Sequence, residues 1–281
     1  MSDNVIIKRI QNIKVNFFMK YNLLFFILII ISKYSFSQIL PSYHAVHHKP
    51  DLILHLDASN SSSLDPDDLT KWNDLSGSNN DFTIKNGLVT YSNEGGGSLE
   101  FDGNDYFCID PISNFNSTNL TISLWIKVTN VTNRVGVLAQ SSRTPTDITN
   151  EFQFLVKSSN GKLNFWDHDG SYGFGSTLSN NSTYETPNIW KYVTFTKDGT
   201  SGKYYINNSF DGSTTADHNV NYGLDWFCIG RDYRHDSSMP SGKSNRYGFE
   251  GYISTVYIYS STQTSDQITQ NYNATKSRYG H

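Results

Sequence analysis

The feature that most limits how this chain can fold is a period-two alternation of apolar and polar residues. Alternate residues of an extended strand point to opposite faces of its sheet, so the alternation predicts strands with one buried face. One run spans residues 120–128, another spans 151–157, and a third begins at Leu163 after the turn Ser159-Asn160-Gly161. Asn-Gly between two such runs is a strong hairpin signal. In the first run Leu120, Ile122, Leu124, Ile126 and Val128 alternate with Thr121, Ser123, Trp125 and Lys127.

Strand patterns of the same kind continue to the end of the chain, around 193–195, 204–206, 227–229 and 249–259. Turn residues separate them, and Tyr, Phe, Thr and Val are frequent, as is typical of strands. One helix is predicted over 265–276, with Ser265 as its cap and Ile268 facing the body of the protein. Many short strands and one helix predict an all-β fold, an antiparallel β-sandwich or jelly roll with a short C-terminal helix.

The first 37 residues are predicted to be a secretory signal peptide. Lys14 and Lys20 precede the apolar run 23–31, and small residues follow it, with cleavage expected between Ser37 and Gln38. The apolar run is much shorter than the roughly 20 residues that span a bilayer, so no stable membrane span is expected after cleavage. The mature protein is therefore expected to be secreted or at the cell surface. Residues 38–50 form a tether, and 51–281 form a single domain, a size that all-β sandwiches reach.

The net charge limits the expected class of partner, and the two cysteines allow one disulfide. The net charge is −4, and no cluster of Lys or Arg follows the signal peptide, so nucleic acid is not an expected partner. Cys108 and Cys228 would both meet an oxidising compartment. They form a disulfide if their strands approach closely, and otherwise they are two separate, partly buried thiols.

Seven blocks of sequence, taken in order, carry a family resemblance. Together they resemble the laminin-G-like, concanavalin A-like jelly-roll family, and they extend over nearly all of 51–279. The resemblance implies two curved sheets packed face to face, often with calcium, and binding of glycans or proteins. Family members often carry an acidic residue after the Gly-aromatic-Ile of the closing strand, where this chain has Ser254. The blocks are 51–59, 72–77, 99–106, 120–127, 189–199, 229–231 and 249–259.

Two places could hold the structural calcium that the resemblance implies. The loop Asp102-Gly103-Asn104-Asp105 offers two carboxylates, and calcium takes several oxygen ligands at one point. The alternative is that Asp102 and Asp105 only shape the turn through bonds to the backbone. The second place follows from the related pentraxins, which hold calcium between comparable loops. Its residues here would be Asp147, Asn150, Asp232 and Asp236.

A sugar-binding groove is predicted on the polar face of the central strands. Aromatic side chains stack on sugar rings, and polar groups orient them. The predicted face carries Trp125, Gln153, Asn164 and Trp166, and the loop beginning at Asp167 extends it with Asp167, His168 and Tyr172. Trp125 and Trp190 are expected to be buried, as large aromatic residues usually are, whereas Trp166 is expected to face solvent.

Signatures of catalysis are missing from the sequence. Glycosidases of this fold often use Glu-x-Asp-x-x-Glu on one strand, and none of the five Glu residues shows that spacing. Asp167-His168-Asp169 could perform acid–base work, but such a loop is more often a solvated turn. A non-catalytic glycan-binding module is therefore expected. The alternatives are a polysaccharide hydrolase or lyase that uses this loop, and a structural adhesion domain that binds protein.

Overall fold

The structure is a computed structural model that describes residues 51–109, 111–112, 115, 118–131, 135–141, 151–157, 160–168, 177–184, 188–215, 226–231 and 248–281. These residues all belong to the compact unit Val46–His281. The predicted signal peptide and tether lie outside the described residues. Within the described ranges, no helix has both the length and the apolar character that crossing a membrane requires.

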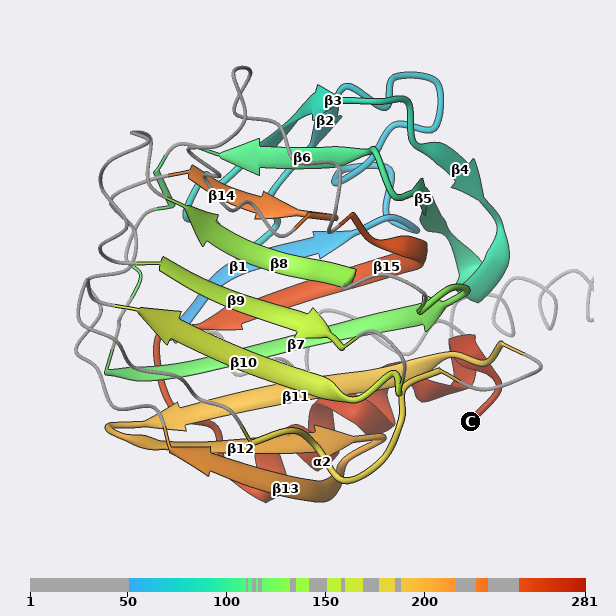
Figure 1. Ribbon diagram of the computed structural model, residues 1–281. Coiled ribbons are helices and arrows are strands. Elements are labelled where there is room, and N and C mark those ends of the chain that lie inside the picture. Colours follow the sequence, from blue (N-terminus) through green and yellow to red (C-terminus); the bar gives the residue numbers. More distant parts are fainter. Residues whose placement is uncertain are drawn as a thin grey trace, which may run out of the picture. The chain divides into compact units, whose positions relative to one another are not determined.

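The described strands form two antiparallel sheets, which confirms the predicted β-sandwich (Figure 1). The eight-stranded sheet runs in the order β13-β12-β11-β7-β15-β5-β4, and β1 pairs with β15 beside it. Its strands are β13 (Ser209–Thr215), β12 (Ser201–Ile206), β11 (Lys191–Asp198), β7 (Asn119–Val128), β15 (Glu250–Tyr259), β5 (Ser98–Asp102), β4 (Thr90–Ser92) and β1 (Leu52–Asp57).

The seven-stranded sheet runs in the order β10-β9-β8-β14-β6-β3-β2. The hairpin predicted around Asn160-Gly161 is its β9–β10 pair, in which Phe165 lies opposite Phe154. Its strands are β10 (Leu163–His168), β9 (Glu151–Val156), β8 (Val135–Ser141), β14 (Trp226–Ile229), β6 (Tyr106–Ile109), β3 (Phe82–Asn86) and β2 (Lys71–Trp72).

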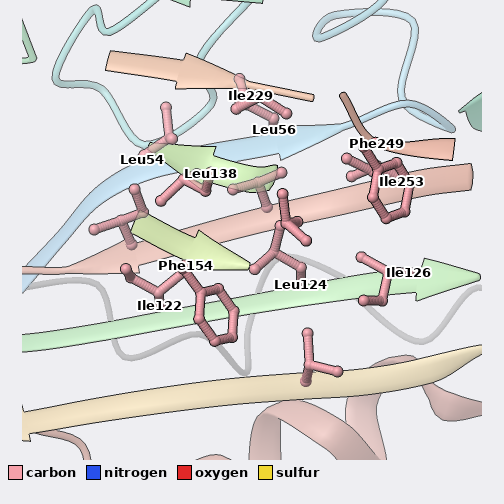
Figure 2. Close-up of a cluster of buried hydrophobic side chains, with 14 of the residues drawn as sticks. Leu54, Leu56, Ile122, Leu124, Ile126, Leu138, Phe154, Ile229, Phe249 and Ile253 are labelled. Atoms are coloured by element: carbon pink, nitrogen blue, oxygen red, sulfur yellow. The ribbon is translucent and has the colours of Figure 1, made fainter. Parts of the chain in front are cut away.

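The hydrophobic core lies between the sheets and is built from alternate residues of each strand. Ile122 and Leu124 of β7 enter it from one sheet, and Leu138 of β8 and Phe154 of β9 enter it from the other (Figure 2). All four side chains are fully buried. This alternation sends the intervening residues of both sheets outward, and it therefore decides which side chains can form a site.

The C-terminal helix α2 (Ser265–Thr275) covers the outer face of the eight-stranded sheet. Thr264, one residue before the predicted cap, accepts a hydrogen bond from the backbone of Gln267 and forms a capping box with its side chain. Ile268 is buried, as predicted. Trp125 lies beneath the helix, where its indole N–H donates to Thr275 at 2.8 Å. The expected burial of Trp125 is confirmed.

The segment after the helix, η4 (Lys276–Tyr279), fastens the C-terminus to the sheet. Arg278 donates two hydrogen bonds of 3.2 Å to the Asp57 carboxylate. Burial alone would raise the pKa of Asp57, but the Arg278 charge and hydrogen bonds from Ser59 bring it below its usual value. Ser254, which stands at the family's acidic position, donates to the Gly97 carbonyl and accepts from Tyr279. Ser254 therefore has a structural role.

Candidate functional site

A row of residues that lie opposite one another on neighbouring strands crosses six strands of the seven-stranded sheet. Phe152, Phe154 and Phe165 fill the core, so the residues between them on β9 and β10 point away from it. We call this line the outward row. In strand order from β10 to β3, it consists of Trp166, Gln153, Ala139, Cys228, Cys108 and Thr83.

Trp166 and Gln153 lie opposite each other at one end of the outward row. Trp166 is 7 % exposed, so the expectation that it faces solvent is wrong. Gln153 is 1 % exposed, and neither its amide oxygen nor its amide nitrogen makes a hydrogen bond with the described part of the chain. Asn164 lies on the same face of β10 as Trp166 and is 5 % exposed. Its side-chain amide donates a hydrogen bond to the Phe165 carbonyl at 3.5 Å. An indole and two amides thus gather on neighbouring strands.

Asp167 does not belong to a binding loop, contrary to the sequence prediction. Strand β10 continues to His168, so Asp167 is a strand residue that points inward, opposite to Trp166. Its carboxylate lies 3.3 Å from the ammonium of Lys197 on the facing sheet, and both side chains are buried. Burial lowers the pKa of Lys197, and the Asp167 charge opposes that shift. This ion pair places the Asp167 carboxylate on the core side of β10, away from the face that carries Trp166.

The predicted place of Trp125 in the groove is also wrong, because Trp125 lies on a different sheet from Gln153. It sits on β7 of the eight-stranded sheet, on the face that α2 covers. The predicted groove therefore keeps Gln153, Asn164 and Trp166, which neighbouring strands do bring together. His168 ends β10 opposite Glu151. Tyr172 and Asp169 lie outside the described residues.

Trp190 shows the same small exposure as Trp166 but lies elsewhere. It precedes β11, is 7 % exposed, and its ring centroid lies 5.1 Å from that of Tyr279. Its expected burial is confirmed. Trp190 is therefore a tryptophan of equal burial that lies outside the outward row.

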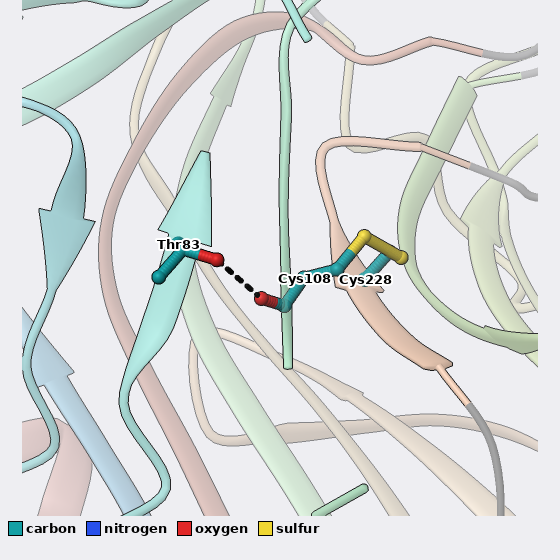
Figure 3. The surroundings of a disulfide bond; sticks show 3 residues. All are labelled: Thr83, Cys108 and Cys228. Carbon is teal, nitrogen blue, oxygen red and sulfur yellow. Dashed lines mark hydrogen bonds between the residues drawn. A yellow bond between two sulfur atoms is a disulfide. The ribbon is translucent and has the colours of Figure 1, made fainter. Parts of the chain in front are cut away.

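Cys108 and Cys228 form a disulfide in the middle of the outward row (Figure 3). They are directly opposite residues of β6 and β14, with Cα atoms 4.2 Å apart. Thr83 of β3 extends the connection, since its hydroxyl donates to the Cys108 carbonyl at 3.4 Å. The disulfide thus joins two strands of the sheet that also carries Trp166 and Gln153.

Asp102 and Asp105 both accept hydrogen bonds from the backbone of their own turn. The Asp102 carboxylate accepts from the Asn104 N–H at 2.8 Å, and Asp105 accepts from the Asp102 N–H at 3.1 Å. Burial raises the pKa of Asp105. These bonds agree with the turn-shaping alternative. No group of three or more His, Cys, Asp or Glu that could hold a metal occurs among the described residues. The other predicted ligands, Asp147, Asn150, Asp232 and Asp236, lie outside them, and the calcium sites stay a prediction.

Solved structures with the same fold include binding domains from bacterial proteins. Domain 4 of AbnA, an extracellular GH43 arabinanase from Geobacillus stearothermophilus solved with arabinotriose, is 18 % identical with a TM-score of 0.58. The alignment covers 80 % of this chain and 98 % of that domain. The receptor-binding domain of the botulinum neurotoxin C/D mosaic is 17 % identical with a TM-score of 0.57. That alignment covers 80 % of this chain and about half, 51 %, of the toxin domain.

A third structure of this kind is the binding domain of botulinum neurotoxin DC in complex with rat synaptotagmin II. It is 14 % identical with a TM-score of 0.57, and the alignment covers 80 % of this chain and 52 % of that one. At these identities the likeness is one of fold. No curated protein sequence matches this chain significantly.

The sequence also matches a family model directly. The model describes the concanavalin A-like lectin/glucanases superfamily and matches residues 101–269, which is more than half of the chain. The match begins in β5 and ends in α2, so it includes every strand that contributes to the Trp166 and Gln153 end of the outward row. From this match and the two antiparallel sheets, the chain belongs to the concanavalin A-like lectin/glucanase superfamily.

Proposed function

We propose that this chain is an exported, non-catalytic carbohydrate-binding module that holds glycans at the Trp166 end of the outward row. The observation that carries the proposal is the registered pair of Trp166 and Gln153 on the face opposite the core. An indole offers a flat apolar surface for the carbon side of a sugar ring, and an amide can both donate to and accept from hydroxyls.

The relatives of the same fold support this class of ligand. One is the arabinanase domain solved with arabinotriose, and another is botulinum neurotoxin type C, whose cell entry depends on two ganglioside molecules. Export is supported by the signal-peptide pattern of residues 1–37. Catalysis is the weaker alternative, because Asp167 is committed to the buried pair with Lys197. A protein partner would be the better account if no glycan bound.

A binding assay with paired tryptophan variants tests this function. The full chain is screened on an array of neutral and sialylated oligosaccharides that includes arabinotriose, and the best ligand is titrated by calorimetry. Trp166→Ala is expected to raise Kd about thirtyfold, since truncating an anchoring Trp costs about 2 kcal/mol. Trp190→Ala is the matched control, because its side chain is equally buried outside the row. It should bind as the parent protein does.

Both alanine variants are expected to lose stability, since each removes a large buried ring. Thermal melting therefore accompanies each titration, and Trp166→Phe with Trp190→Phe replaces them where folding fails. An equal loss of affinity in the two variants would contradict the site. Release of reducing sugar by the parent protein would contradict the non-catalytic assignment.

A further inference from the structure

Strand β10 is the last strand of the seven-stranded sheet, and it carries Trp166 on its outward face. In the described part of the chain it pairs with β9 alone, so alternate backbone N–H groups point away from the sheet at its free edge. Side-chain hydroxyls accept from two of these groups. The Leu163 N–H donates to Ser179 at 2.8 Å, and the Phe165 N–H donates to Tyr204 at 2.8 Å. The two hydroxyls thus stand where a further strand would supply carbonyl groups.

Tyr204 reaches this edge from the facing sheet. It lies on β12, and its fully buried ring has its centroid 5.4 Å from that of Phe195. While accepting from the Phe165 N–H, its hydroxyl donates to the Thr177 carbonyl at 3.0 Å, and the Asn164 side chain donates to the same hydroxyl oxygen. Burial raises the pKa of Tyr204 to about 12, although hydrogen bonds from Phe165 and Asn164 oppose the rise. The hydroxyl therefore keeps its proton at neutral pH and bonds to two groups of β10 at once.

We propose that Tyr204 is a positioning residue of the glycan site, which holds the Trp166 end of β10 from the opposite sheet. Phe165, whose N–H it binds, stands between Asn164 and Trp166 in the sequence. Without the hydroxyl this buried N–H would lose its partner, a cost that the strand lowers by shifting toward water. Such a shift moves Asn164 and Trp166 together, and a site that is held loosely binds more weakly. This inference rests on the proposed function and names a residue that supports its site without touching the glycan.

Tyr204→Phe tests this role in the full chain, with Tyr259→Phe as the matched control. Both tyrosines are fully buried, and the Tyr259 hydroxyl accepts from Asn271 of α2 at 3.1 Å. The probe is the oligosaccharide of the array, arabinotriose included, that the parent protein binds best. Tyr204→Phe is expected to raise its Kd about fivefold and Tyr259→Phe to leave it unchanged, although each lowers the melting temperature by about 3 °C. Hydrogen exchange at the Phe165 amide, followed by NMR, should be faster in Tyr204→Phe alone.

A double-mutant cycle separates positioning from a general loss of stability. Asn164→Ala removes an amide that bonds to Tyr204, so its effect on Kd should be smaller in the Tyr204→Phe background than in the parent protein. In the Tyr259→Phe background its effect should equal that in the parent protein. If Tyr204→Phe does not fold, Ser179→Ala replaces it, and faster exchange at the Leu163 amide together with weaker binding is then expected. Unchanged binding by Ser179→Ala would overturn the inference.

The remaining outcomes separate this role from the proposed function. If the parent protein binds a glycan and Trp166→Ala loses it, but Tyr204→Phe keeps full affinity, the role of Tyr204 is wrong and the proposed function stands. Unchanged exchange at the Phe165 amide in Tyr204→Phe would also overturn the role. An equal loss of affinity in Tyr204→Phe and Tyr259→Phe would show a general effect of stability instead of positioning. Binding of no glycan by the parent protein would overturn the proposed function itself, and this role with it.

Discussion

Replacing Lys197 by methionine should lower the free energy of unfolding by about 3–5 kcal/mol, which is the usual cost of removing one partner of a buried ion pair. The Lys197 ammonium lies 3.3 Å from the Asp167 carboxylate, and the two side chains are 1 % and 0 % exposed. Without the ammonium, a buried carboxylate loses the opposite charge beside it. Urea denaturation of the full chain at neutral pH measures the loss.

Two further variants show whether the effect belongs to the pair. Lys203→Met, at an exposed position on the adjacent strand β12, should change stability by less than about 0.5 kcal/mol. Combining Lys197→Met with Asp167→Leu should recover much of the lost stability, because an apolar pair of similar size often replaces a buried ion pair at little cost. A Lys197→Met protein as stable as the parent would show that the pair does not contribute to the core.

Removing the disulfide by Cys108→Ala and Cys228→Ala should cost about 2–4 kcal/mol, the typical contribution of a native disulfide. The bond joins residues 120 apart in sequence, and a long closed loop gives a large reduction in the entropy of the unfolded chain. Denaturation of the parent protein with and without dithiothreitol, at equal pH, measures the same difference without a mutation.

The double-alanine variant is the control for the reductant, because its stability should not respond to dithiothreitol. Thiol titration of the unfolded parent protein should find two thiols after reduction and none before. Free thiols in the untreated protein, or unchanged stability after complete reduction, would contradict a stabilising disulfide. The disulfide lies in the outward row, so affinity for the glycan that binds best should be measured in both redox states.

The sequence pattern predicted several structural features that depend on neighbouring residues. The alternation over 120–128 predicted which residues of β7 enter the core, and the Asn-Gly turn predicted the β9–β10 hairpin. The burial of Ile268 followed from the same kind of reasoning. In each case the face of a strand or helix is fixed by residues two to four positions away.

Features that depend on residues distant in the sequence could not be predicted from the sequence pattern. Asp167-His168-Asp169 resembles a turn, yet β10 continues to His168, which lies opposite Glu151 of β9, and the Asp167 carboxylate lies beside Lys197 of the facing sheet. Alternation shows that Trp125 and Trp166 avoid the core, but it cannot show that they lie on different sheets. The Asp57–Arg278 contact, between residues 221 apart, had no local signal either.

The most direct test of the glycan site is a crystal structure of the protein with the oligosaccharide that binds it best. The account predicts that the sugar ring lies against Trp166, with a sugar hydroxyl within about 3 Å of the Gln153 amide. Density for the sugar on the eight-stranded sheet, or at any place that does not contact Trp166 or Gln153, would contradict it.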